Sequence, residues 1–212
     1  VKFTTAKESL YPDTGNIITG QVRVFKQEGI ERLDRSNLLV FLDRVPGFFP
    51  PSGALPALSQ QGQRFAPRVL PVVKRTKVEF PNDDRVFHNV FSLSRSRPFD
   101  LDAYPPGETR SMRFDETGWI KVYCNIHAEM NAHILVLDNP FFSLTDQAGL
   151  FVIPGVPDGR YPLRIWHELG GEVRRSIEVE GGGLHYLDIE IWEDRKILQH
   201  KNKFGKSYPE KY

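Results

Sequence analysis

The sequence predicts an all-β protein built from two β-sandwich modules. In runs such as "IITGQVRVF" and "GWIKVYC", apolar and polar residues alternate, which is the pattern of a strand with one buried face. The 212 residues include 17 glycines and 16 prolines, and many of these separate one run from the next. Short alternating runs bounded by turn residues are typical of sandwiches and barrels and not of helical bundles.

The N-terminal section is expected to contribute two strands. Residues 17–25 and 36–43 carry the strand pattern, and a polar turn around Gly29 joins them. Two strands are too few for an independent core. The next residues, 46–71, contain too many prolines for the interior of a sheet, so they are interpreted as a connecting segment.

The middle section carries five strand-like runs: "KVEF", "RVFHNVFSLS", "GETRSMRF", "GWIKVYC" and "AHILVLD". From Asn139 onward the pattern continues in "SLTDQAGLFVIPGVPDGRYPLRIWHE", "EVRRSIEVE" and "LHYLDIEIW", with a hairpin turn expected at residues 181–183. We expect the first and last sections to complete one another as a discontinuous domain, residues 1–50 and 140–193. A linker (51–65), an inserted domain (66–139) and a basic C-terminal tail (194–212) complete the division.

Composition and charge exclude several classes of function. A formal net charge of +1 gives no reason to expect a nucleic-acid partner. No apolar run approaches the roughly 20 residues that cross a bilayer, so we expect no transmembrane segment. Because the chain begins at Val1, we expect that a leader has been removed and that the protein is periplasmic or otherwise extracytoplasmic.

The one cysteine, Cys124, has a histidine three residues after it and a methionine three residues after that, in "CNIHAEM". Strand alternation places Cys124 on the apolar face with Ile120 and Val122. In an extended chain Cys124 and Met130 would lie about 20 Å apart. The loop must therefore fold back if both sulfur atoms, and His127 between them, are to bind one atom.

A second histidine, His88, alternates in register with Val86 and Val90, and it is the clearest candidate for a further ligand. Two imidazoles and a thiolate in a plane, with a weak axial thioether, form the ligand set of a type 1 copper site. Structural zinc normally uses two or more cysteines, and covalent haem attachment needs a second cysteine. A cysteine nucleophile is disfavoured because its base usually comes from a distant part of the chain. A simple buried cysteine stays open as an alternative.

The stretch "VYCNIHAEM", preceded by "FPNDDRVFHNVFS", resembles the copper-binding signature of the cupredoxin family, and its short loop is similar to that of amicyanin and shorter than that of most plastocyanins. The resemblance covers about residues 66–139 and implies a Greek-key barrel with one type 1 copper held by His88, Cys124, His127 and Met130. It also implies that Asn89 helps to hold the ligand loop by hydrogen bonds. Ala128 stands where the family often has proline.

The flanking sections resemble the carboxypeptidase regulatory-like, or transthyretin-like, sandwich through Gly149, Phe151, Gly155, Gly159 and Tyr161. Together the resemblances imply a non-enzymatic carrier of single electrons between extracytoplasmic partners such as a cytochrome or an oxidoreductase. Two alternatives stay open: a copper storage or delivery protein, and a structural subunit of a larger, membrane-associated redox complex. We expect His127 to be the exit for the electron, and His133 and His167 to be structural.

Overall fold

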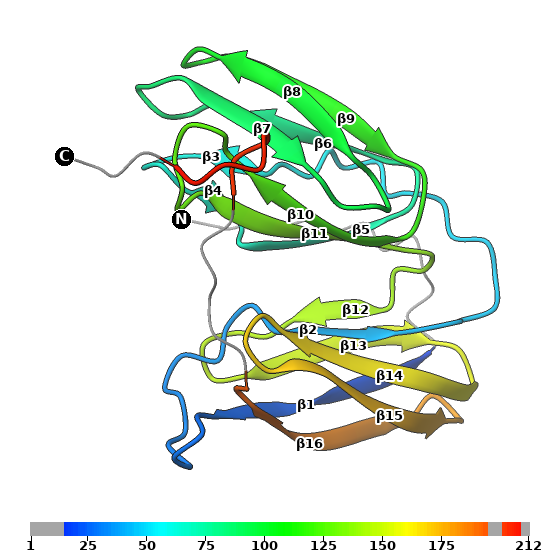
Figure 1. The fold of residues 1–212 in the computed structure, drawn as a ribbon. Helices are drawn as coiled ribbons and strands as arrows, with labels where there is room; N and C mark the ends of the chain where they lie inside the picture. Colours follow the sequence, from blue (N-terminus) through cyan, green and yellow to red (C-terminus); the bar gives the residue numbers. More distant parts are fainter. Residues whose placement is uncertain (1–14, 195–200, 209–212) are drawn as a thin grey trace, which may run out of the picture. The chain divides into compact units, whose positions relative to one another are not determined.

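The computed structural model describes residues 15–194 and 201–208, and it is all-β, as predicted. Its strands are β1 (Asn16–Phe25), β2 (Leu39–Leu42), β3 (Ser59–Gln60), β4 (Phe65–Ala66), β5 (Val69–Val73), β6 (Thr76–Pro81), β7 (His88–Ser92), β8 (Phe99–Tyr104), β9 (Thr109–Phe114), β10 (Gly118–Tyr123), β11 (Asn131–Leu137), β12 (Phe142–Leu144), β13 (Leu150–Val156), β14 (Gly159–His167), β15 (Gly171–Val179) and β16 (Leu184–Trp192) (Figure 1). Among the described residues, no helix has the length and apolar character needed to cross a membrane.

The chain divides into two compact units. Unit 1 comprises residues 1–45 and 141–195, and unit 2 comprises residues 46–140 and 196–212. Residues 1–14, 195–200 and 209–212, which the expected first domain and tail include, lie outside the described residues. The second unit thus includes the proline-rich segment and the C-terminal segment together with the middle strands.

Unit 1 is a pair of stacked sheets, in the orders β13-β1-β16 and β12-β2-β14-β15 (Figure 1). Strand β1 buries alternate side chains, among them Ile18, Val22 and Val24, as its pattern predicts. It pairs antiparallel with β13 and parallel with β16. The two strands of the N-terminal section, β1 and β2, lie in different sheets. Each therefore pairs with strands of the last section.

The turn at residues 181–183 corrects one expectation. Gly181 and Gly182 have φ values of 70° and 69°, so a tight turn is present. It is not a hairpin, however, because β15 belongs to one sheet and β16 to the other. Alternation alone does not report whether a chain returns beside itself or crosses to a facing sheet, and here it crosses.

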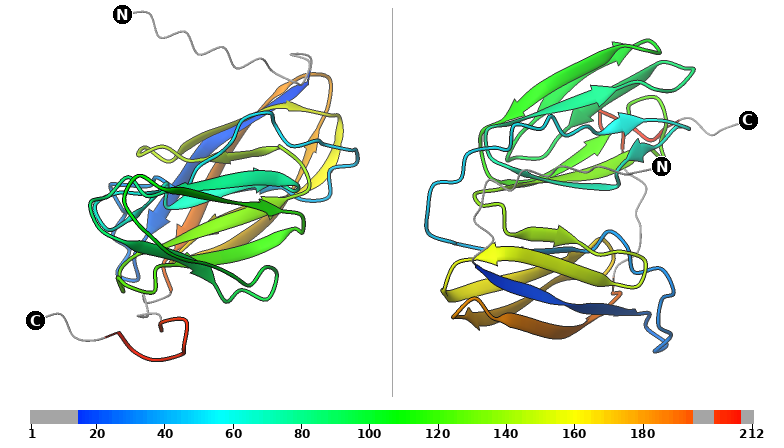
Figure 2. Two further views of the ribbon diagram at one scale, coloured as in Figure 1. Left: turned by 90° about the horizontal axis from the view of Figure 1, so that it is seen from above. Right: turned by 180° about the vertical axis from the view of Figure 1, so that it is seen from behind.

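Unit 2 contains a five-stranded sheet, β5-β11-β10-β7-β8, and two pairs, β6-β9 and β3-β4. The β6-β9 pair lies opposite β5, β10 and β11 (Figures 1 and 2). One apolar cluster joins them, with Phe80 and Phe114 from the pair and Ile120, Val122 and Ile134 from the sheet. The core of this unit therefore lies between two layers, and the metal-ligand candidates Cys124 and Met130 belong to the same cluster.

Four strands of unit 2, β3, β4, β5 and β8, were not expected from the sequence. Strand β5 lies in the proline-rich segment, and it tolerates Pro71 because it is an edge strand paired only with β11. Strand β8 is the other edge, and its alternating apolar residues are hidden among aspartates and flanking prolines. The expected linker, 51–65, also contains β3 and the first residue of β4, and these two short strands pair with each other.

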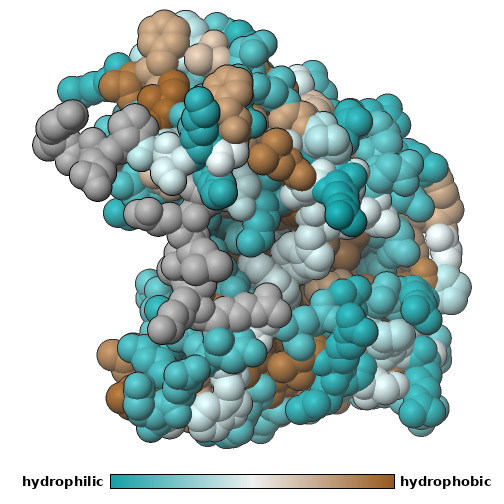
Figure 3. All heavy atoms as spheres, in the orientation of Figure 1, coloured by the Kyte–Doolittle hydropathy of each residue, from teal (hydrophilic) through white to brown (hydrophobic). Residues whose placement is uncertain are grey.

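On the face seen in Figure 3, hydrophilic side chains predominate and apolar groups lie in small patches. Val86 is one of the exposed apolar residues, at 39%. Val86 was expected to alternate with His88 and Val90 along one strand. Strand β7 begins at His88, however, so Val86 belongs to the preceding loop.

We predict that Gly20→Ala destabilises unit 1. A Cβ atom at Gly20 would lie 2.0 Å from the carbonyl oxygen of Leu187 on β16, so the central β1-β16 pairing must shift. The free energy of unfolding should fall by about 1–3 kcal/mol, as for other overpacked positions. Chemical denaturation followed by circular dichroism measures it. Gly53→Ala is the control, since nothing lies within 4 Å of its Cβ position; equal losses in both variants would contradict the prediction.

Candidate metal centre

The pairing of β7 with β10 brings two distant segments to the same end of a sheet. The strands run antiparallel, with Tyr123 opposite Phe91. The start of β7 therefore lies beside the residues that follow β10. His88 is the first residue of β7 and Cys124 comes directly after β10, so these side chains meet although 36 residues separate them.

The loop between β10 and β11 carries the remaining candidates. It is closed by two backbone hydrogen bonds: the Cys124 amide donates to the Met130 carbonyl at 3.1 Å, and the Met130 amide donates to the His127 carbonyl at 3.1 Å. The loop thus folds back on itself, which is the condition stated above for Cys124, His127 and Met130 to bind one atom. Met130 is fully buried, in the apolar cluster that also contains Cys124.

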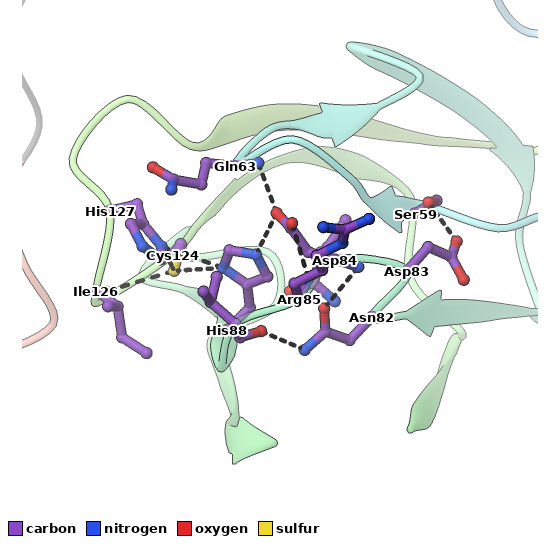
Figure 4. A network of polar contacts seen from close by, with 12 residues as sticks. Ser59, Gln63, Asn82, Asp83, Asp84, Arg85, His88, Cys124, Ile126 and His127 are labelled. Atoms are coloured by element: carbon purple, nitrogen blue, oxygen red, sulfur yellow. Dashed lines mark hydrogen bonds and ion pairs between the residues drawn. The ribbon is translucent and has the colours of Figure 1, made fainter. Parts of the chain in front are cut away.

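Three ligand atoms converge at this end of the sheet (Figure 4). The Cys124 Sγ atom lies 3.9 Å from His88 Nδ1 and 3.8 Å from His127 Nδ1, and the two Nδ1 atoms lie 3.1 Å apart. The point equidistant from these three atoms is roughly 2.1 Å from each, a normal length for bonds from a metal ion to imidazole and thiolate ligands. One metal ion held by His88, Cys124 and His127 would therefore satisfy all three atoms.

The site is largely closed to solvent. His88 and Cys124 are fully buried, and His127 is the ligand candidate with partial exposure. Burial of the polar His88 ring would be costly without hydrogen-bond or metal partners. The amide of Ile126 also approaches the Cys124 sulfur at 3.4 Å, a geometry suited to a thiolate that accepts a hydrogen bond.

Asp84 determines which nitrogen of His88 faces the site. Its Oδ2 atom lies 3.0 Å from His88 Nε2. Hydrogen bonds from the Gln63 amide, and then from His88, lower the pKa of Asp84 to about 2, so the carboxylate is ionised near neutral pH. An ionised carboxylate accepts only, so Nε2 carries the proton and the lone pair of Nδ1 points toward Cys124 and His127.

The loop that carries Asp84 is itself held from two sides. Asn82, which is fully buried, donates to the carbonyl groups of Val86 and Tyr104, at 3.0 and 3.1 Å. The amide of Gln63 donates to Asp84 at 2.7 Å (Figure 4). Sequence reasoning missed Asp84 and Gln63; the only signal was an acidic residue four positions before His88. The segment interpreted as a linker thus helps to orient His88, a candidate ligand.

Asn89 donates from Nδ2 to Asp100 Oδ1 at 2.7 Å. Its Oδ1 atom is buried and has no hydrogen-bond partner among the described residues. The hydrogen bond of Asn89 therefore runs to the β8 edge and not directly to the ligand loop. Burial acts to raise the pKa of Asp100, but hydrogen bonds from Lys203 and Asn89 hold that pKa below its usual value.

The C-terminal segment also reaches the site. The phenol of Tyr208 donates to the carbonyl oxygen of Cys124 at 2.6 Å. Burial, followed by the charge of Cys124, raises the pKa of Tyr208 above its usual range, which keeps the phenol protonated as a donor. No pattern in the sequence indicates this contact, because 84 residues separate the two partners.

The other two histidines considered lie in strands and away from the ligand cluster. His133 is 4% exposed on β11, and its ring meets the edge of Trp119 at 6.4 Å between centroids. His167 ends β14, where its Nδ1 accepts from the Gly170 amide at 3.1 Å. Burial lowers the pKa of His167, which favours its neutral form. Both have structural contacts within their own units.

Several solved structures resemble part of this chain. A purple cupredoxin from Nitrosopumilus maritimus is 22% identical, with a TM-score of 0.35, over 38% of this chain and 98% of that chain. A copper-containing nitrite reductase from Thermus scotoductus SA-01 is 24% identical, with a TM-score of 0.39, over 45% and 28%. A reduced amicyanin mutant is 17% identical, with a TM-score of 0.38, over 41% and 91%. No family model and no curated protein matches the chain.

We predict that Asp84→Asn weakens metal binding. The amide side chain loses the charge that fixes His88, so affinity for Cu(II) or Co(II) should fall roughly 10- to 100-fold. Competition titration against a chelator of known affinity measures the change. Asp83→Asn is the matched control. Asp83 lies beside Asp84 in the same loop, and among the described residues its carboxylate accepts from the Ser59 hydroxyl, at 2.7 Å. The prediction fails if the two variants bind metal equally well.

Proposed function

We propose that this protein is a type 1 copper protein that carries single electrons. The observation that supports the proposal is the triangle of His88 Nδ1, Cys124 Sγ and His127 Nδ1, with sides of 3.1, 3.8 and 3.9 Å. A ligand set of two imidazoles and one thiolate in a trigonal arrangement is that of electron-transfer copper sites. Met130, buried in the same cluster as Cys124, would supply the thioether ligand.

The donor set favours copper over the alternatives. Thiolate and thioether suit Cu(I), imidazole suits both oxidation states, and Cu(II) has the highest affinity among the divalent ions of its row. Structural zinc would require further cysteines, and the sequence has one. When bound, copper would supply a one-electron couple between Cu(I) and Cu(II).

Residues of the chain would hold the ligands in place and exclude water while copper changes its oxidation state. Asp84 holds His88 in one tautomer, and the Ile126 amide stabilises the thiolate of Cys124. Burial of Cys124 and Met130 excludes water, which limits the rearrangement that accompanies a change of charge. His127, the partly exposed ligand, is the proposed exit for the electron, because its loop lies at the end of the sheet.

We propose an extracytoplasmic redox protein, such as a cytochrome or an oxidoreductase, as the partner. The proposal is that of a carrier and not an enzyme. Unit 1 would serve as a scaffold or docking module, with the resemblance to carboxypeptidase regulatory-like domains as its support. Copper storage or delivery, and a place as a structural subunit of a larger membrane-associated complex, are the competing functions.

We predict an intense visible absorption band from the thiolate-to-copper transition after loading with Cu(II). Cys124→Ser should abolish the band, since the hydroxyl cannot replace the thiolate as a donor. Met130→Leu should retain a band with an altered position, because it removes the thioether but leaves the thiolate in place. Absorption and electron paramagnetic resonance spectra provide the test; a colourless copper-loaded wild type would overturn the assignment.

We predict reversible one-electron voltammetry for the copper-loaded protein, with slow loss of copper to an acceptor protein or chelator. Burial of Cys124, His88 and Met130 is the reason for both expectations. Loss of copper requires the site to open, whereas transfer of an electron does not. Cyclic voltammetry and a copper-transfer assay separate the functions. Rapid transfer of copper combined with irreversible voltammetry would favour storage or delivery over electron transfer.

A further inference from the structure

The segment of residues 201–208 folds back onto the ligand loop of its own unit. It starts with a tight turn, in which Gly205 has a φ of 75° and its amide donates to the Asn202 carbonyl at 2.9 Å. The Asn202 side chain accepts from the amides of Phe204 and Lys206, both at 3.0 Å. Figure 1 shows this segment in red. It therefore has a defined local structure, although its composition suggests a solvated tail.

Three hydrogen bonds attach this segment to Cys124, to its neighbour Asn125 and to Asp100 on β8. The Lys203 amide donates to Asn125 Oδ1 at 2.9 Å, and the Lys203 ammonium contacts Asp100 Oδ2 at 2.6 Å. The Tyr208 phenol donates to the Cys124 carbonyl at 2.6 Å. Asp100 in turn holds Asn89, the neighbour of His88. The attachment thus reaches both chain segments that supply ligands.

The contacts at Cys124 and Asn125 bear on the thiolate itself. The peptide groups between Cys124 and Ile126 determine where the Ile126 amide points, and that amide approaches the Cys124 sulfur at 3.4 Å. Holding the Cys124 carbonyl and the Asn125 side chain therefore fixes the donor that faces the sulfur. Hydrogen bonds to the cysteine sulfur tune the potential of such copper sites.

We propose that residues 201–208 form a strap across the ligand loop, and that Tyr208 is a positioning residue for the metal centre. The strap limits opening of residues 124–127, and so slows exchange of the metal and maintains the hydrogen bond to the thiolate. The effect on the loop stands on the contacts above, whereas the effect on copper rests on the proposed function. The ring of Tyr208 and the turn at Asn202 would remain in place if the phenolic hydroxyl alone were removed.

Tyr208→Phe tests the strap in the full-length protein. Without metal, hydrogen exchange of the Ile126 and Lys203 amides should accelerate roughly 2- to 10-fold, the effect of losing one hydrogen bond. With Cu(II) bound, transfer of copper to EDTA should accelerate by a similar factor. The reduction potential should fall, because a weaker hydrogen bond leaves more electron density on the sulfur and favours Cu(II).

Two further variants make the test specific. Lys203→Met removes the contact with Asp100 but keeps the backbone amide, and it should change the same two amides in the same direction. Tyr186→Phe is the control, because Tyr186 lies on β16 of unit 1 and is 58% exposed. Acceleration in Tyr208→Phe and Lys203→Met, with none in Tyr186→Phe, supports the strap.

The outcomes separate the strap from the proposed function. Unchanged exchange of both amides in Tyr208→Phe, within twofold of wild type, overturns the strap even where the copper band is normal. A copper-loaded protein without the thiolate band overturns the proposed function, while the metal-free exchange experiment still decides whether the strap exists. A normal potential and copper-transfer rate in Tyr208→Phe overturn the positioning role.

Discussion

The antiparallel contact between β7 and β10 is the constraint on which the candidate metal centre depends. It places the first residue of one strand beside the residues that follow the other, so His88 and Cys124 face the same point. The loop after β10 then needs only a short reversal, closed by two backbone hydrogen bonds, to bring His127 to that point as well. The remaining contacts of the site orient groups that the sheet has already placed.

These contacts are hydrogen bonds that surround the Cys124 sulfur atom at increasing distance. Asp84 sets the tautomer of His88, and the expected linker segment supplies the amide that keeps Asp84 ionised. The Ile126 amide faces the sulfur, and the C-terminal segment holds the peptide groups on which that amide depends. Three stretches of sequence that supply no candidate ligand therefore act on the candidate ligands.

The parts of this arrangement that sequence reasoning found are those with a local signature. Alternation in "GWIKVYC" predicts the buried face of Ile120, Val122 and Cys124, which the structure confirms. Strand β5 was missed because Pro71 excludes an interior strand but not an edge strand. No periodic pattern in the sequence marks Tyr208 or Gln63. Their contacts depend on which distant segment of the chain lies beside them. Sheet membership at the 181–183 turn was missed for the same reason.

The parallel pairing of β1 with β16 has a consequence for the order in which the molecule is made. Partners in this pairing lie 167 residues apart, as in the contact of Arg23 with Glu190. Long sequence separation slows folding, because a large loop must close before its contacts form. During synthesis, every strand of unit 2 leaves the ribosome before β16 does. The sheet that carries the candidate ligands can therefore assemble before β1 gains its partner β16, and residues 201–208 join a candidate ligand loop that has already been synthesised.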